Sequence, residues 1–288
     1  MTTPNPSAAS RLPVPTTAEG RAGLGALLDD PGRAVIALDF DGTLAPIVPD
    51  PADARALPAA VDALRQLTPI IGIMAVLTGR PALAAVEYAS LDQIPGVVVL
   101  GHYGRQRWQN GQVETPSAPE GLAVARQRLP EVLTEASAPD GIFIEDKGEA
   151  LAVHTRRTAE PAVALEQIRP RLLALAAETG LRAEPGRFVI ELRPEGADKG
   201  IALVALAGGR DTSAVMFGGD DLGDRPAFAA VRRMRESGLP GIAVCSDSAE
   251  VADLADEVDL IVDGPEGIAA LLAGIAAEIG RRSGARTS

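Results

Sequence analysis

The sequence predicts an α/β protein whose parallel-sheet core is interrupted by an inserted α+β domain. Short apolar runs alternate with helix-like patterns at both ends of the chain, and these runs are continuously hydrophobic. In the middle, the pattern changes to helix, two strands, helix, two strands. Continuously apolar strands that alternate with helices are typical of a parallel sheet covered on both faces. We therefore expect one core built from both ends of the chain and a separate cap between them.

Composition excludes several classes of protein. The chain has 288 residues, 46% of them hydrophobic, and a net charge of −12. No apolar run approaches the roughly 18 residues of a membrane span, and the acidic balance disfavours nucleic acid and anionic membranes as partners. Cys245 is the only cysteine, so no disulfide can form within the chain. We expect a cytoplasmic monomer with a flexible, uncleaved tail over residues 1–20.

The first part of the core is expected at residues 21–110. Its apolar runs predict buried strands, and the amphipathic stretches between them predict helices. The expected strands lie at 34–40, 72–79 and 96–101, and the expected helices at 57–67 and 81–89.

The cap is expected at residues 111–196, directly after a hairpin turn predicted at Asn110-Gly111. Its paired strands imply an antiparallel sheet. Helices are expected near 120–136 and 161–179, with strands at 141–148, 149–157 and, as a hairpin, 181–194.

The second part of the core is expected at residues 197–288, where the first rhythm returns. Helices are expected at 199–208, 225–238 and 268–280, and strands at 214–220, 241–247 and 258–264.

Polar residues follow the expected core strands at the points where they end. In an open parallel sheet, ligands bind beyond the carboxyl ends of the strands. An unpaired buried carboxylate is costly, so aspartates there indicate a cation or reaction chemistry, although a turn or a helix cap is the alternative. The residues at these ends are Asp39, Asp41, Gly42 and Thr43, then Thr78, Gly79 and Arg80, and finally Asp220, Asp221 and Asp224, with Lys199 at the start of the preceding helix.

This set of side chains suits a phosphate monoester and Mg²⁺. An all-oxygen ligand set with open positions is what Mg²⁺ prefers. Thr78 and Lys199 can donate to phosphate oxygens, while one aspartate attacks phosphorus and another manages the proton. Lys147 and Lys199 are the only lysines among 27 basic residues, and each lies in an Asp-Lys-Gly triplet. They are candidates for point-charge contacts, unless an arginine-biased composition simply left them there.

Four motifs give a family resemblance. "DFDGTL", "LTGR", "DKG" and "GGDDLGD" occur in that order, with the cap between the second and the third. They resemble the motifs of haloacid dehalogenase-like phosphatases, which implies a Rossmannoid parallel-sheet core with a C2-type cap. The segments "IEDKGEALAVHTR", "FVIELRPEGADKGIAL" and "VMFGGDDLGDRPAF" resemble trehalose-6-phosphate phosphatases more specifically, and the similarity runs from about residue 34 to about residue 275.

The resemblance implies a role for each matching residue. Asp39 would be the nucleophile, and Asp41 would protonate the leaving sugar and then activate water. Thr78 and Lys199 would bind the phosphoryl group. The implied Mg²⁺ ligands are Asp39, the Asp41 carbonyl and Asp220, with Asp221 and Asp224 ligating or orienting waters and Lys199; the implied substrate contacts are Gly79, Arg80, Glu145, Lys147, Arg156 and Glu191.

The function expected from this resemblance is Mg²⁺-dependent hydrolysis of trehalose 6-phosphate to trehalose and phosphate, through an aspartyl-phosphate. Two alternatives stay open. The chain could act on another sugar phosphate, such as sucrose 6-phosphate or mannosyl-3-phosphoglycerate. It could also be a non-catalytic regulatory module, although Asp39, Asp41, Lys199 and Asp220 are all present.

Overall fold

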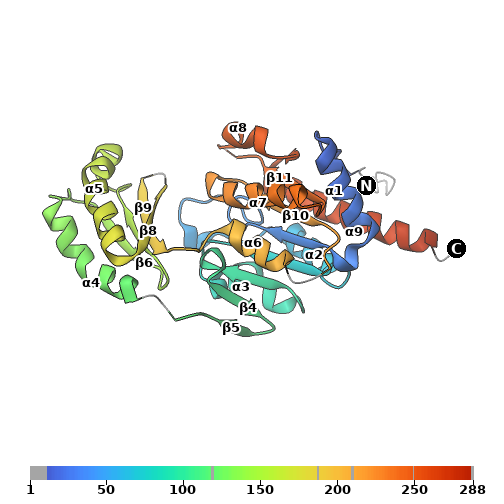
Figure 1. Cartoon of the computed structure of the whole chain (residues 1–288), viewed down its shortest axis with the longest axis horizontal. Coiled ribbons are helices and arrows are strands. Elements are labelled where there is room, and N and C mark those ends of the chain that lie inside the picture. Colours follow the sequence, from blue (N-terminus) through green and yellow to red (C-terminus); the bar gives the residue numbers. More distant parts are fainter. Residues whose placement is uncertain (1–11, 118–119, 187, 209–210, 249, 287–288) are drawn as a thin grey trace, which may run out of the picture. The chain divides into compact units, whose positions relative to one another are not determined.

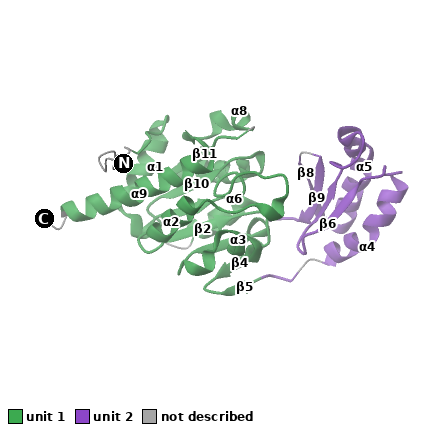
Figure 2. Ribbon diagram, turned by 180° about the vertical axis from the view of Figure 1, so that it is seen from behind, with its two compact units in different colours: residues 1–114, 198–288 green, residues 115–197 purple. Residues whose placement is uncertain are grey.

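A computed structural model describes residues 12–117, 120–186, 188–208, 211–248 and 250–286. The chain divides into two compact units (Figure 2). Unit 1 comprises residues 1–114 and 198–288, and unit 2 comprises residues 115–197. The expected cap began at residue 111. The division falls four residues later because the second strand of the Asn110-Gly111 hairpin pairs with unit 1.

Unit 1 contains an eight-stranded sheet within the described residues (Figure 1). Its order is β12-β11-β10-β1-β2-β3-β4-β5, and the six strands from β12 to β3 are parallel. The strands are β1 (Val35–Leu38), β2 (Ile73–Leu77), β3 (Val98–Gly101), β4 (Gln106–Gln109), β5 (Gln112–Glu114), β10 (Val215–Gly219), β11 (Gly241–Ser246) and β12 (Leu260–Val262).

Helices cover both faces of this sheet, which confirms the α/β prediction. All residues of β1 and β10 are buried because each strand has apolar neighbours above and below it. One apolar core lies under α1, α2, α3 and α9, and another lies under α6 and α7. The helices are α1 (Ala18–Asp29), α2 (Pro58–Leu67), α3 (Ala82–Ala89), α6 (Lys199–Ala207), α7 (Arg225–Glu236), α8 (Val251–Leu254) and α9 (Gly264–Arg286).

Helix α1 occupies a segment that the sequence suggested was partly a tail. Residues 1–11 lie outside the described residues, but residues 12–20 do not form a loose end. Thr17 caps α1, and both Thr17 and Arg235 bond the carboxylate of Asp259. The glycines of this segment weaken its helical sequence pattern, so the packing of α1 was not predicted. A Cβ on Gly23 would lie 2.1 Å from the Gly241 carbonyl oxygen, so only glycine permits the close approach.

Unit 2 is an α+β layer, as predicted. Its sheet has the order β6-β7-β9-β8 and is antiparallel throughout. Alternate residues such as Leu151 and Val153 pack beneath the two helices, while Ala152 and His154 face the other side. The elements are α4 (Glu120–Glu135), β6 (Phe143–Asp146), β7 (Leu151–His154), α5 (Pro161–Thr179), β8 (Leu181–Gly186) and β9 (Val189–Pro194).

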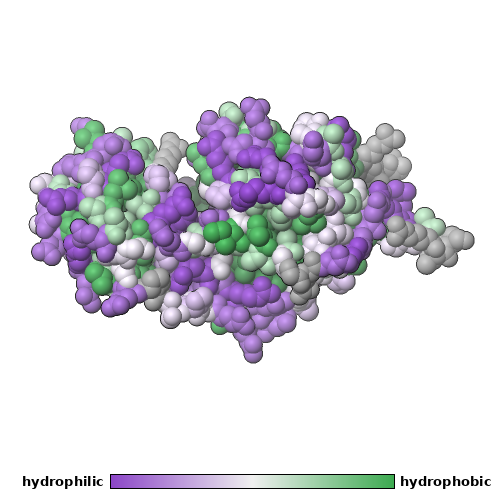
Figure 3. Space-filling model, in the orientation of Figure 1, coloured by the Kyte–Doolittle hydropathy of each residue, from purple (hydrophilic) through white to green (hydrophobic). Residues whose placement is uncertain are grey.

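The surface is mainly hydrophilic on the face shown in Figure 3. A hydrophobic area lies over α6, where Ile201 and Val204 are about half exposed. Cys245 is fully buried in β11, which agrees with a core role. Among the described residues, the structure contains no helix with the length and apolar character needed to cross a bilayer.

Candidate active site

Three aspartates from distant parts of the chain meet at the carboxyl edge of the unit 1 sheet. Asp39 directly follows β1, Asp220 directly follows β10, and Asp224 ends the short helix η5 (Leu222–Asp224). One carboxylate oxygen from each lies within 4.8 Å of the others, and all three residues are buried. β1 and β10 are parallel neighbours, so their ends fall side by side. This is the juxtaposition that the strand-end reasoning predicted.

Lys199 supplies the positive charge of this cluster. It is the first residue of α6, and its Nζ lies 2.6 Å from Asp39 Oδ1 and 2.7 Å from Asp224 Oδ1. Burial alone would lower the pKa of Lys199, but attraction to Asp224 and Asp39 outweighs it and raises that pKa well above the usual range. The two carboxylates therefore favour the charged form of Lys199.

Burial and mutual repulsion oppose ionisation of the aspartates in this cluster. Burial raises the pKa of Asp39 well above its ordinary value. Burial, together with repulsion from Asp39 and Asp224, raises the pKa of Asp220 to about 9. Carboxylates shift in this way when burial and neighbouring carboxylates disfavour the charged form.

Asp220 has the features of a cation ligand. Its Oδ1 is buried without a hydrogen-bond partner among the described residues. Gly42 has φ +76°, and a Cβ at this position would lie 2.1 Å from Asp220 Oδ2. The absence of a side chain at Gly42 therefore allows the backbone after Asp41 to approach the Asp220 carboxylate. An unpartnered buried oxygen beside two further carboxylates fits a hard divalent cation. The residues present are thus compatible with a metal at this position.

Asp224 and Asp221 have different surroundings from the other aspartates. Asp224 Oδ2 accepts from the backbone N–H groups of Asp220 and Asp221, at 2.8 and 3.2 Å, while Oδ1 accepts from Lys199. Both of its oxygens are thus engaged in orienting neighbours. Asp221 lies outside the three-aspartate cluster and forms a capping box with Asp224 at η5. The cap that the sequence left as an alternative is therefore present.

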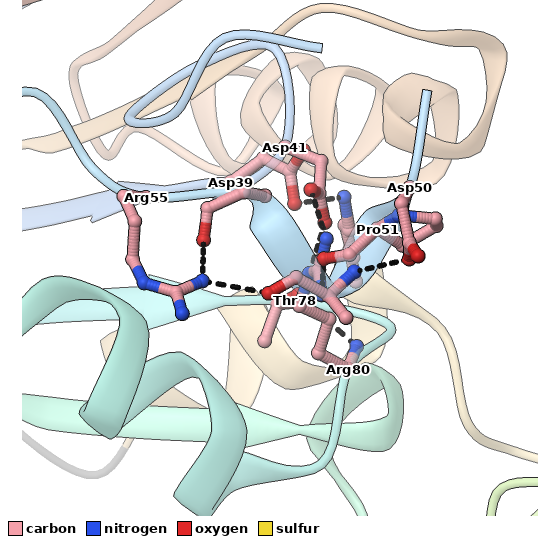
Figure 4. Close-up of polar contacts among 10 residues, drawn as sticks. Asp39, Asp41, Asp50, Pro51, Arg55, Thr78 and Arg80 are labelled. Carbon is pink, nitrogen blue, oxygen red and sulfur yellow. Dashed lines mark hydrogen bonds and ion pairs between the residues drawn. The ribbon is translucent and has the colours of Figure 1, made fainter. Parts of the chain in front are cut away.

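Asp41, Thr78 and Arg80 form a second group beside the cluster (Figure 4). Arg80 binds Asp41 through two parallel hydrogen bonds, Nε to Oδ2 and Nη2 to Oδ1, each 2.6 Å long. Thr78 is buried after β2, and its Oγ1 accepts from the Arg80 backbone N–H at 3.1 Å. Gly79 lies against Tyr103, whose hydroxyl would be 2.7 Å from a Cβ at that position. The expected side chains therefore lie together, but Arg80 faces Asp41.

In unit 2, most of the expected sugar contacts lie on the sheet face away from the helices. Glu145, Ala152 and Glu191 are in register on neighbouring strands. Lys147 Nζ lies 2.7 Å from Glu191 Oε2, and Glu191 Oε1 is buried without a partner among the described residues. Arg156 follows β7 and is exposed, outside this group.

Several residues that support the site were not singled out as site residues from the sequence. Ser246 Oγ donates to the Gly42 carbonyl at 2.6 Å, and Ser248 Oγ donates to the Asp220 carbonyl at 2.6 Å. Both serines lie at or just after the end of β11, so their position at a strand end was the available signal. His154 Nε2 lies 3.0 Å from Glu145 Oε2. Thr43, which the sequence did place at a strand end, has a buried Oγ1 without a partner among the described residues.

The amino-acid sequence is similar to those of known proteins. Residues 37–258 match the family described as trehalose-phosphatase. A trehalose-phosphate phosphatase of Mycobacterium leprae is 30% identical over 220 residues, which is 72% of this chain and 50% of that protein. An uncharacterized glycosyl hydrolase of Mycobacterium tuberculosis is 34% identical over 215 residues, 69% of this chain. The chain spans half of the first relative and 15% of the second.

Structural comparison gives the same fold. The trehalose-6-phosphate phosphatase C-terminal domain of Candida albicans superposes with a TM-score of 0.73 at 19% identity, covering 92% of this chain and 99% of that one. At this identity the match shows the fold alone, a parallel-sheet core interrupted by a second α+β unit. The family match covers most of the chain, including the strand ends that carry Asp39, Thr78 and Asp220. The chain therefore belongs to the trehalose-phosphatase family.

Proposed function

We propose that this chain hydrolyses trehalose 6-phosphate to trehalose and inorganic phosphate. The observation that carries the proposal is the buried group of Asp39, Lys199, Asp220 and Asp224 at the sheet edge. It combines a carboxylate nucleophile, an ammonium donor and ligands for a cation in one place. Family membership supports the same reaction.

In the first half of the reaction, a carboxylate oxygen of Asp39 attacks phosphorus. The new Asp39–phosphorus linkage forms as the bond from phosphorus to the sugar oxygen breaks, and the electron pair goes to that oxygen. A proton from the Asp41 carboxyl group neutralises the sugar oxygen, so trehalose leaves as an alcohol. Lys199 contributes positive charge beside the attacking carboxylate, where negative charge gathers in the transition state.

In the second half, water attacks phosphorus of the aspartyl-phosphate. Its proton passes to the Asp41 carboxylate, and the electron pair of the breaking bond returns to Asp39. This step releases inorganic phosphate and restores both side chains. Mg²⁺, held by Asp39 and Asp220 with the Asp41 carbonyl, would neutralise charge on the phosphoryl oxygens when bound.

The polar face of the unit 2 sheet supports a sugar as the leaving group. Glu145, Glu191 and Glu184 are cross-strand neighbours along one row, with the small Ala152 between the first two. Fixed carboxylates accept hydrogen bonds from sugar hydroxyls, and the Lys147 ammonium group can donate hydrogen bonds to sugar oxygens. A site of this kind rejects a ligand that leaves its buried polar groups unpaired. Glu191 Oε1 is such a group.

A substrate panel tests the choice of sugar. We expect phosphate release from trehalose 6-phosphate to exceed release from sucrose 6-phosphate and mannosyl-3-phosphoglycerate by at least about 100-fold in kcat/KM, because unmatched buried polar groups are costly. In Glu191→Gln, KM for trehalose 6-phosphate should rise about tenfold, with little change for a small aryl phosphate. Preference for sucrose 6-phosphate would refute the proposed substrate.

Metal binding is tested by thermal unfolding of the metal-free protein. Mg²⁺ at about 100 times its Kd should stabilise the folded state by about 2.7 kcal/mol, while Asp220→Asn should respond far less. The proton on Asp220 competes with the cation, so the stabilisation should increase from pH 7 toward the pKa of about 9. Asp62→Asn, a surface variant on α2, is the matched control. An equal response in Asp220→Asn would contradict this metal site.

A further inference from the structure

Arg80 is held in place from several sides, all within unit 1. Its guanidinium makes the two 2.6 Å bonds to Asp41 and donates from Nη1 to the Pro51 carbonyl at 2.8 Å. The guanidinium carbon lies 5.4 Å from the centre of the Phe40 ring and 5.2 Å from that of Tyr88. Figure 4 shows Arg80 with its polar partners Asp41 and Pro51. Contacts of both kinds restrict the rotation of the guanidinium plane.

The backbone of Arg80 is fixed as well. Its N–H donates to Thr78 Oγ1, and its carbonyl accepts from the His102 N–H at 2.9 Å. The segment after β2 is thereby tied to the segment after β3. An arginine held at both its backbone and its guanidinium is suited to orienting another group.

The paired carboxylate retains the capacity to exchange a proton. A carboxylate has about four lone-pair positions, and the two bonds from Arg80 use one on each oxygen. The Asp41 side chain is 36% exposed, against 15% for Arg80. Arg80 therefore fixes the plane of the Asp41 carboxylate from one side and leaves the other side open. Its Nε, Nη1 and Nη2 already donate to Asp41 and Pro51, which makes Arg80 a poor partner for a phosphate.

We propose that Arg80 is a positioning residue for Asp41 and is not a ligand of the phosphoryl group or the sugar. This inference rests on the proposed phosphatase function and deepens it. Arg80 orients the carboxyl group that protonates the leaving oxygen in the first half of the reaction and accepts the proton of water in the second. The contribution of Arg80 to the rate of the first half therefore depends on whether the leaving group must be protonated to depart.

Leaving-group dependence separates positioning from substrate binding. The ratio kcat/KM covers the steps up to departure of the leaving group. A sugar alkoxide needs a proton to leave, whereas 4-nitrophenolate does not. In Arg80→Gln we expect kcat/KM to fall about 100-fold for trehalose 6-phosphate and less than about threefold for 4-nitrophenyl phosphate, the first figure being typical of a lost general acid.

Further variants distinguish orientation from folding. Arg80→Lys keeps the charge but cannot form two parallel bonds, so it should recover only part of the lost activity. Tyr88→Leu removes a ring against which Arg80 packs and should show the same substrate selectivity with a smaller loss. Arg65→Gln breaks the surface pair with Asp62 and should leave kcat/KM unchanged for both substrates. Melting temperatures of all variants identify any loss caused by unfolding.

Two results would overturn the proposal. Equal losses with both substrates would show that Arg80 binds the phosphoryl group, and no loss with either would show that Arg80 leaves Asp41 unaffected. A wild-type protein that cleaves aryl phosphates but not trehalose 6-phosphate would instead refute the proposed substrate. The role of Arg80 is then read from a series of aryl phosphates, in which log(kcat/KM) should depend more steeply on leaving-group basicity in Arg80→Gln than in the wild type.

Discussion

Replacing Asp39 by asparagine should lower the rate of phosphate release by at least about 10⁴-fold, because the amide cannot attack phosphorus. The fold should survive the change. The asparagine side chain has nearly the same size as that of aspartate, and the substitution removes a charge from a site where burial raises the pKa of the carboxyl. Phosphate release and thermal unfolding, measured on the same preparation, check the two expectations.

The control for this prediction is an aspartate outside the cluster. Asp62 pairs with Arg65 on the surface of α2, so Asp62→Asn should retain full turnover. A turnover in Asp39→Asn within tenfold of wild type would exclude the covalent mechanism. An inactive wild-type protein would instead favour the non-catalytic alternative.

Replacing Lys199 by methionine should both abolish turnover and destabilise the protein. Asp39 and Asp224 would lose the ammonium that lies 2.6 and 2.7 Å from them. Removing one partner of a buried ion pair leaves an uncompensated charge, which costs about 3–5 kcal/mol. Urea unfolding of the metal-free protein measures this loss, and phosphate release measures the activity.

A double variant separates charge from packing. In Lys199→Met combined with Asp39→Asn, the Asp39 charge is gone, so part of the lost stability should return while turnover stays absent. Full stability in the Lys199→Met single variant would contradict the buried ion network. The same loss in single and double variants would attribute the effect to the unpaired Asp224 or to packing of the Lys199 side chain.

The core could be predicted from the sequence because every position of its central strands is apolar. Val35, Ile36 and Ala37 are buried on both faces of the sheet, and such strands read as unbroken apolar runs. Once the strands were placed in parallel, their ends had to lie at one edge. The meeting of Asp39 with Asp220 followed from that topology.

Other features depend on side-chain pairs that no local pattern specifies. The bond between Arg80 and Asp41 joins residues far apart in sequence, and either could equally have faced the substrate. Asp221 could cap η5 or bind a cation, and only the structure shows that it forms the capping box. Helix α1 was obscured because glycines such as Gly23, which weaken a helical pattern, are required for its contact with Gly241.

The pairing of β1 with β10 also has a consequence for biosynthesis. Val35 in β1 pairs with Val215 in β10, so one edge of the central strand has no native partner until the ribosome has passed the entire inserted unit. Nascent chains that stop before residue 215 would display an apolar, unpaired strand edge, which invites self-association. Prematurely terminated products of this gene should therefore accumulate as insoluble material.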